Sequence, residues 1–274
     1  MNVLWGAVLV LGTATVTTLL MLLVRRRSPE GSYFSDGDRA SGVFGVIATG
    51  FSVLLGFIIF LAFDSYDESR SGAETEAIVV GQQVETAQFM PAGAAEELTG
   101  ELVCYGRSVV GTEWSAMEAG TLGDSINPWG AAMFLTLKSV RPTSDTEQSA
   151  YDRWMEQTST REQARHARVH GAEGIIPWPL WLVLFTISGV IFVFMLFFAD
   201  RAERARTQVL LMGSVTVVIS LLLLLLVFFD RPHGEGSGKL GPTAMERSLR
   251  RISSELDVAQ LRLDPPCDAD GTAR

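Results

Sequence analysis

Four long apolar segments dominate the pattern of hydrophobic and polar positions along the chain. Each contains 22 residues and no ionisable side chain, and together they cover residues 3–24, 42–63, 178–199 and 208–229. Because a helix rises ~1.5 Å per residue, each segment can cross a hydrocarbon layer of roughly 30 Å. The pattern therefore predicts four transmembrane helices, numbered as spans one to four.

Beyond the second span, apolar residues continue at helical spacing through an otherwise polar stretch. They are Tyr66, Ala73, Ala77, Val80, Val84 and Ala87. This period predicts that the second helix projects out of the membrane and ends before Pro91, since proline cannot continue a helix. Further helices are predicted over residues 92–117, 129–140 and 144–170, with a loop rich in turn residues over 120–128.

The C-terminal tail, residues 230–274, is predicted to hold one amphipathic helix. Met245, Leu249, Ile252 and Leu256 recur at spacings of three and four after a glycine-rich turn. The polar face of this helix carries charges of both signs. That mixture favours docking on the helical domain that follows span two over a position on the membrane surface.

Basic residues beside the spans predict the orientation of the chain. The two loops that carry them hold Arg25, Arg26, Arg27 and Arg39 after span one, and Arg201, Arg204 and Arg206 after span three. Because arginines in short loops are retained in the cytoplasm, we expect both loops there, and both termini and residues 64–177 on the other side. The basic cluster follows span one, which favours an uncleaved anchor over a signal peptide.

The predicted fold class is all-α: a four-span transmembrane helical bundle with an extracytoplasmic helical domain between spans two and three. Its boundaries are 1–63 for spans one and two with their cytoplasmic loop, and 64–177 for the extracytoplasmic domain. Residues 178–229 form spans three and four, and residues 230–274 form the extracytoplasmic tail with its amphipathic helix.

The net charge of −9 comes mainly from the predicted extracytoplasmic domain. Residues 64–177 contain 18 Asp and Glu against 8 Lys and Arg. A surface of that sign repels nucleic acid and concentrates small cations. We therefore expect the lipid bilayer and small ions as partners, and no nucleic acid.

Small residues recur at intervals of three or four along span two, at Ser41, Gly45, Thr49, Ser52 and Gly56. One interpretation is tight packing, because such spacing lets another helix approach closely. The other is that this face lines a pore, where Phe51, Phe57 or Phe60 forms an apolar gate. Four spans enclose little space, so a pore requires a homo-oligomer.

Acidic residues stand at both ends of span two, with Asp36 and Asp38 on the predicted cytoplasmic side and Asp64, Asp67 and Glu68 on the other. In a ring of subunits these carboxylates would form charged collars at the pore mouths and favour cations over anions. The alternative is that they are the solvated ends of a membrane helix, since charges commonly flank a span.

The two cysteines, Cys104 and Cys267, both fall on the predicted extracytoplasmic side. Oxidising conditions there allow a disulfide to persist. Two unconnected thiols are an equally good interpretation, because a disulfide requires a short distance between the two Cα atoms and the sequence alone does not give that distance.

Motifs for catalysis or metal binding are scarce. Glu162, His166 and His170 are spaced by four and share one face of a helix, as three zinc ligands can, but a solvated polar helix is favoured. The sequence has no phosphate-binding loop, no Gly-x-Ser-x-Gly, no His-Glu-x-x-His and no paired Cys-x-x-Cys. We expect no metal site, no cofactor, no catalytic residues and no enzymatic activity.

Several short elements together resemble a known family. They are residues 34–38 before span two, Tyr105 with Arg107, Glu113–Trp114, Pro177 with Trp181 at the entry to span three, and Asp230-Arg231-Pro232 after span four. Over residues 34–252 the chain resembles the bacterial bestrophin-like family of membrane proteins of unknown function. The family name implies similarity to bestrophin anion channels, whereas the family itself implies no established activity.

These observations lead to two functional hypotheses for a multi-pass protein of the bacterial plasma membrane. In the first, a homo-oligomer conducts ions passively and span two lines the pore. In the second, the protein is a non-conducting membrane scaffold or envelope sensor that acts through its outer helical domain. The spans contain no Asp, Glu, His, Lys or Arg, which disfavours a proton-coupled or ion-coupled transporter.

Overall fold

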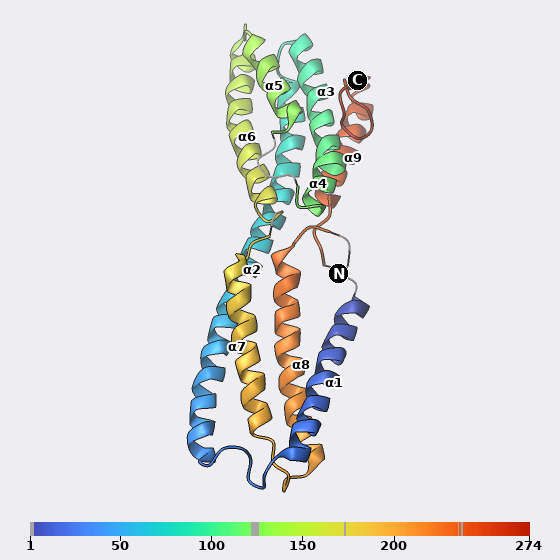
Figure 1. Ribbon diagram of the computed structural model, residues 1–274. Coiled ribbons are helices and arrows are strands. Elements are labelled where there is room, and N and C mark those ends of the chain that lie inside the picture. The colour runs from blue at the N-terminus through green and yellow to red at the C-terminus, as the bar shows by residue number, and fades with distance from the viewer. Residues whose placement is uncertain (1–2, 122–125, 173, 235, 237) are drawn as a thin grey trace. The chain divides into compact units, whose positions relative to one another are not determined.

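The computed structural model describes residues 3–121, 126–172, 174–234, 236 and 238–274. The regular secondary structure of this part of the chain is entirely helical (Figure 1). Its elements are α1 (Val3–Arg27), α2 (Gly37–Ala87), α3 (Ala92–Ser108), the π-helix η1 (Val109–Glu113), α4 (Trp114–Glu118), α5 (Pro128–Ser139), α6 (Asp145–His170), α7 (Trp178–Phe197), α8 (Ala205–Asp230) and α9 (Thr243–Val258). Of the predicted loop over residues 120–128, residues 122–125 lie outside the described part.

Four helices of the described chain are long and apolar enough to cross a membrane: Leu4–Arg27, Gly37–Ala87, Trp178–Phe197 and Ala205–Asp230. They coincide with the four apolar segments of the sequence, so the predicted all-α class and the four spans are confirmed. The second helix is 51 residues long. Its apolar positions continue without a proline as far as Ala87, which explains why it does not end with span two.

The chain divides into two compact units. Unit 1 comprises Met1–Asp64 and Ile175–Asp230, and unit 2 comprises Ser65–Gly174 and Arg231–Arg274. Unit 1 contains the four apolar segments, and unit 2 contains the remaining helices. The long helix α2 contributes its first half to unit 1 and its second half to unit 2.

The core of unit 1 forms where α2, α7 and α8 meet. One face of α2 buries Phe51, Leu55, Ile58 and Ala62 against residues of α7 and α8. Helix α1 packs along α8 (Figure 1), where the hydroxyls of Thr17 and Thr216 lie 3.0 Å apart. This hydroxyl contact leaves neither oxygen without a partner inside an apolar bundle.

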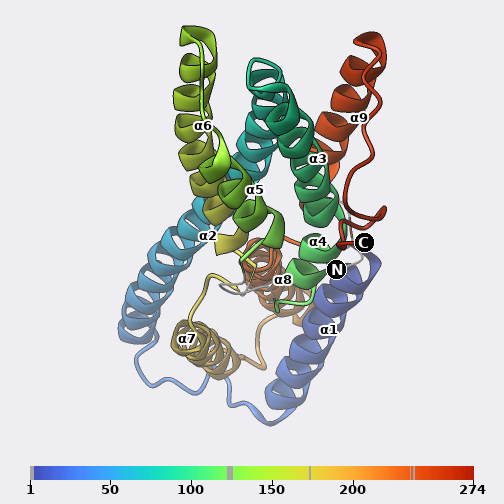
Figure 2. The ribbon, with the colours of Figure 1, turned by 90° about the horizontal axis from the view of Figure 1, so that it is seen from above.

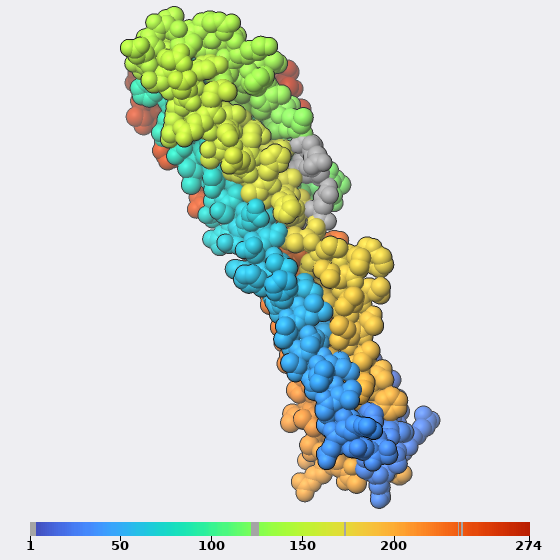
Figure 3. Space-filling view, turned by 90° about the vertical axis from the view of Figure 1, so that its left-hand side faces the viewer, coloured from blue at the N-terminus to red at the C-terminus, as the bar shows by residue number. Residues whose placement is uncertain are grey.

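Helices α3, α6 and α9 surround the second half of α2 in unit 2 (Figure 2), and their apolar faces share one core. Helices α2 and α6 lie side by side along one face of the unit (Figure 3). A Cβ atom added to Gly72 would lie 2.6 Å from the backbone nitrogen of Arg168 and 2.7 Å from the carbonyl oxygen of Ala164. Only glycine allows the two backbones to approach this closely.

The tail helix α9 packs on unit 2. Met245 and Ile252 are almost completely buried in its core, and Ser248 donates a hydrogen bond of 2.6 Å to the carbonyl oxygen of Ala77 in α2. This is the docking that the mixed charges of its polar face favour over a position on the membrane surface.

Candidate functional site: the open face of α2 and a buried charge network

The small-residue face of α2 is open in unit 1. All five residues proposed to line a pore or pack a helix are exposed in the structure; they are Gly45, Thr49, Ser52, Gly56 and Phe60. A Cβ atom added to Gly45, Gly50 or Gly56 would meet no other atom within 4 Å. No described helix of the chain therefore packs on this face, and its neighbours in a membrane come from outside the chain.

The aromatic residues of span two divide between its two faces. Phe57 and Phe60 are 60% and 61% exposed. Phe51 is 4% exposed and belongs to the core of unit 1. Phe51 is thus excluded as an apolar gate, and the expectation that included it is wrong at this position. Phe51 and Phe57 are six residues apart, so at roughly 100° per residue they point to different sides of α2. Phe51 lies on the side that receives α7 and α8.

The acids at the two ends of span two are exposed. Asp36 caps the start of α2, where its carboxylate accepts a hydrogen bond of 3.0 Å from the backbone nitrogen of Arg39. Asp38 lies in the first turn, where the helix dipole favours a negative charge. Asp64, Asp67 and Glu68 follow along the same helix and are exposed to solvent.

One of these acids continues the small-residue face. At roughly 100° per residue, steps of three and four lead from Gly45 through Gly56 and Phe60 to Asp67. Asp64 and Glu68 stand to the side of that line. A charged collar on this face would therefore be built first from Asp67.

A network of charged side chains lies inside unit 2, and sequence reasoning missed it. The guanidinium group of Arg168 in α6 is fully buried between two carboxylates. Its Nε lies 2.5 Å from Oε2 of Glu76 in α2, and its Nη2 lies 2.6 Å from Oε2 of Glu113 in η1. Arg165 contacts the other oxygen of Glu113 at 2.8 Å, and Tyr105 donates a hydrogen bond of 2.6 Å to Glu76.

Local helix geometry puts these groups together. Arg161, Arg165 and Arg168 are spaced by four and three residues, so they share one face of α6. Glu113 ends a single π-helical turn between α3 and α4, an irregularity that recurs at functional sites because it turns a side chain out of the regular helical register. Asn127 caps α5 and donates a hydrogen bond of 3.0 Å to the same carboxylate.

Arg161 extends the network without a fully buried carboxylate of its own. Its guanidinium carbon lies 4.9 Å from the centre of the Tyr105 ring, a cation–π contact. Its Nη1 donates to the side-chain oxygen of Gln83 at 2.9 Å, and its Nη2 contacts the partly exposed carboxylate of Glu162 at 3.0 Å. The three arginines therefore tie α6 to α2, α3 and η1.

Burial and charge oppose each other in this network. Burial by itself would raise the pKa of Glu113, but Arg168 and Arg165 outweigh it and lower the pKa below its ordinary value. Burial disfavours the charged form of Arg168, and Glu76 and Glu113 nevertheless raise its pKa. Burial, followed by the charge of Glu76, raises the pKa of Tyr105. The network thus favours the ionised forms of Glu113 and Arg168 and the neutral phenol of Tyr105.

The arrangement is suited to holding helices together. Each buried carboxylate of Glu76 and Glu113 is taken up by guanidinium groups, so neither is an available base or nucleophile. Within the described part of the chain no three His, Cys, Asp or Glu side chains are grouped as metal ligands, and this includes Glu162, His166 and His170.

A disulfide joins Cys104 of α3 to Cys267 of the tail, with their Cα atoms 5.7 Å apart. The end of the tail then lies against α3 and α5. Trp129 donates a hydrogen bond of 2.6 Å from its ring nitrogen to the carbonyl oxygen of Gly271, and Arg107 donates one of 3.1 Å to the carbonyl oxygen of Asp268. These contacts fix the last residues of the chain on unit 2.

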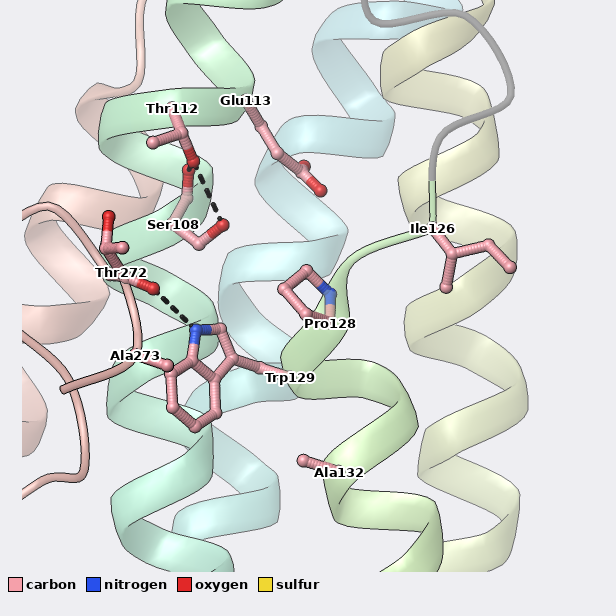
Figure 4. A pocket seen from close by; sticks show the side chains of 10 residues that line it. Ser108, Thr112, Glu113, Ile126, Pro128, Trp129, Ala132, Thr272 and Ala273 are labelled. Atoms are coloured by element: carbon pink, nitrogen blue, oxygen red, sulfur yellow. Dashed lines mark hydrogen bonds between the residues drawn. The ribbon is translucent and has the colours of Figure 1, made fainter.

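A cavity of about 480 Å³ lies between this tail and η1. In Figure 4, Trp129 points its ring nitrogen at the tail backbone, and Ser108 and Thr112 line the same space from the α3–η1 side. The hydroxyls of Ser108 and Thr112 lie 3.3 Å apart. Most of the lining is apolar, so the cavity offers few groups that could orient a polar ligand.

The fold and the open α2 face define a multi-span helical membrane protein. Residues 11–237 match the Bestrophin-like domain family, and the chain belongs to that family. This agrees with the resemblance noted in the sequence. No curated protein matches the chain significantly.

Solved structures share the fold at low sequence identity. The crystal structure of a bacterial bestrophin homologue from Klebsiella pneumoniae has a TM-score of 0.68 at 14% identity, and covers 92% of this chain and 99% of its own. A single-residue variant of that homologue has a TM-score of 0.68 at 15% identity, and the match covers 89% of this chain and 99% of the variant. A crystal structure described as that of a membrane protein has a TM-score of 0.69 at 13% identity, and the match covers 92% of this chain and 99% of the other.

Proposed function

We propose that this bestrophin-like protein forms a homo-oligomeric passive ion channel in the bacterial plasma membrane, with the first half of α2 lining the pore. The observation that carries the proposal is the open small-residue face of α2. A face of Gly, Thr and Ser that packs on no described helix of its own chain leaves room for water at the axis of a ring. The opposite face of α2 packs against α7 and α8, so it cannot line a pore.

The proposed selectivity is for cations. The exposed acids at the two ends of span two would be repeated around the ring, and Asp67 shares the face of the small residues. Repeated carboxylates at a narrow mouth raise the local concentration of cations over anions. The excess of negative charge in residues 64–177 acts in the same direction.

Conduction and selectivity are tested together in planar bilayers. The reconstituted protein should pass current, and in a salt gradient its reversal potential should lie closer to the equilibrium potential of the cation than to that of the anion. Replacing Asp64 and Asp67 with Asn and Glu68 with Gln should lower the cation-to-anion permeability ratio several-fold, because the local potential that enriches cations is weakened.

The matched control removes the same number of charges from unit 2 away from α2, as Glu96→Gln, Asp152→Asn and Glu156→Gln. We expect this variant to keep the selectivity of the unmodified protein. A preference for anions in the unmodified protein would contradict the proposed role of the acidic collars, but it would still support a pore. Folded oligomers that carry no current at any voltage would favour the scaffold or sensor instead.

We further propose that the two arginine-bearing loops face the cytoplasm, and that residues 64–177 and both termini lie outside. Single cysteines at Arg26 and Arg204, and at the exposed positions Gly93 and Arg262, test this orientation in a background with Cys104 and Cys267 changed to Ala. A membrane-impermeant thiol reagent added to intact cells should label positions 93 and 262 fully and positions 26 and 204 only after permeabilisation. The reverse labelling would invert the orientation.

A further inference from the structure

A second cavity, of about 460 Å³, lies inside unit 1 at the end of the bundle that carries the loop arginines. Helices α1, α2, α7 and α8 enclose it. Its walls are apolar and adaptable, formed mainly by Met21, Met195, Met212, Phe44, Phe198 and Leu211. Methionine side chains are flexible and fit irregular apolar shapes, and the volume is in the range of roughly 300–1,000 Å³ that holds small ligands.

One end of this cavity is polar and has an unused hydrogen-bond acceptor. Gln208 lines the cavity and is only 6% exposed. Its Nε2 donates to the carbonyl oxygen of Asp200 at 2.9 Å and to the carboxylate of Glu203 at 3.0 Å. Its Oε1 is buried and has no hydrogen-bond partner in the described chain. A buried acceptor of this kind is normally satisfied, so the occupant of the cavity is expected to bring a donor.

The polar end is held in place by the two loops around it. Arg25 donates hydrogen bonds to the carbonyl oxygens of Arg201, at 3.1 Å, and Glu203, at 2.5 Å. The carboxylate of Asp200 accepts from the backbone nitrogens of Gly31, at 3.1 Å, and Ala202, at 2.8 Å. The oxygens of Gln208 and Glu203 are therefore held in place, and the guanidinium group of Arg25 lies beside Glu203.

We propose that this cavity binds one phospholipid with a primary ammonium headgroup. The ammonium donates hydrogen bonds to Gln208 Oε1 and to the carboxylate of Glu203, which also lines the cavity. The phosphate lies beside the guanidinium group of Arg25, and an acyl chain packs against the methionines and phenylalanines. The site does not depend on whether the protein conducts ions.

The choice of headgroup follows from donors and charge. Gln208 Oε1 and the Glu203 carboxylate can only accept hydrogen bonds. A trimethylated ammonium has no N–H to donate. An anionic glycerol headgroup would bring no positive charge to Glu203. A primary ammonium supplies both the donors and the charge.

Native mass spectrometry of the delipidated full-length protein tests the proposal. Phosphatidylethanolamine and phosphatidylcholine with identical acyl chains are the probes, because they differ only in the three methyl groups that replace the ammonium N–H groups. We expect one phosphatidylethanolamine per chain, bound at least several-fold more tightly than phosphatidylcholine. Equal binding of the two lipids by the unmodified protein would overturn the headgroup assignment.

Two variants locate the site. Gln208→Met removes one of the two proposed acceptors and should reduce the preference between the two lipids. Leu211→Trp fills the cavity and should weaken both. Leu210→Trp is the matched control, because Leu210 is 71% exposed and does not line the cavity. Binding unaffected by Leu211→Trp would show that the lipid lies elsewhere, and that result stands even if the Gln208 variant does not fold.

Discussion

Replacing Arg168 with Met is expected to lower the free energy of unfolding by about 3–5 kcal/mol, the usual cost of breaking a buried ion pair by removing one partner. The reason is that the guanidinium group of Arg168 contacts the carboxylates of both Glu76 and Glu113. Its loss leaves Glu76 buried with a hydrogen bond from Tyr105 but without its charged partner. The measurement is the unfolding of the full-length protein in nanodiscs, followed by circular dichroism.

Arg153→Met is the matched control for this substitution. Arg153 lies on the same helix, and its side chain is 57% exposed and forms a surface ion pair with Glu156. Exposed pairs contribute ~0–1 kcal/mol, so this variant should unfold close to the unmodified protein. Equal destabilisation by the two variants would contradict a special role for the buried network.

The pH dependence of the Arg168 variant separates charge from packing. The pKa of Glu113 is lowered in the folded protein, so its ionised form contributes stability above the ordinary value of 4.5, and that contribution is lost as the pH falls through the lowered pKa. Without Arg168, Glu113 loses the larger of the two charges that lower its pKa and takes up a proton more readily, so the defect should be smaller at pH 5 than at pH 8. An unchanged defect would indicate lost packing of the arginine side chain instead.

The transmembrane helices could be predicted because their signal is local. Each span is marked by its own length without charge, whatever it packs against. The extension of α2 could be predicted for the same reason, since the apolar positions from Tyr66 to Ala87 keep a helical period and Pro91 follows. Nothing about the rest of the chain is needed to recognise these elements.

The charge network could not be predicted because its partners are distant in sequence. Glu76 and Arg168 are separated by 92 positions. Helix α6 is largely polar apart from a few apolar positions such as Trp154, so a solvated helix was the natural interpretation of the segment that holds Glu162, His166 and His170. The buried face is the neighbouring one. Three arginines at spacings of four and three along α6 were the available signal.

The small-residue face of span two shows a different limit. Its spacing identifies a surface on which something approaches closely, but the pattern is the same for a helix, a subunit or a water-filled path. The structure excludes the described helices of the chain itself at Gly45 and Gly56. The interpretations that survive require a second copy of the chain or the bilayer.

Reducing the disulfide between Cys104 and Cys267 is expected to lower the free energy of unfolding by roughly 2–4 kcal/mol, below the full chain-entropy value for a long closed loop. The two cysteines are 163 positions apart, so the bond constrains most of the unfolded chain. The expected loss is below that full value because α9 still holds the tail through Met245 and Ile252. The measurement compares unfolding midpoints with and without reductant. The double variant Cys104→Ser/Cys267→Ser should not respond to reductant.

Local release of the tail distinguishes this disulfide from a passive crosslink. Gly271 has a φ of +80° and its α-carbon packs so closely on Ser108 that an added Cβ would overlap the backbone of α3. Such a contact, and the hydrogen bond from Trp129 to the carbonyl oxygen of Gly271, require the tail to be held in one position. Reduction should therefore red-shift the fluorescence of buried Trp129 and open the chain to trypsin after Arg262, before any helix unfolds. The shift should be absent from Trp129→Phe. A reduced protein that keeps both the emission spectrum and the protease resistance of the oxidised one would mean that hydrogen bonds and close packing hold the tail without the disulfide.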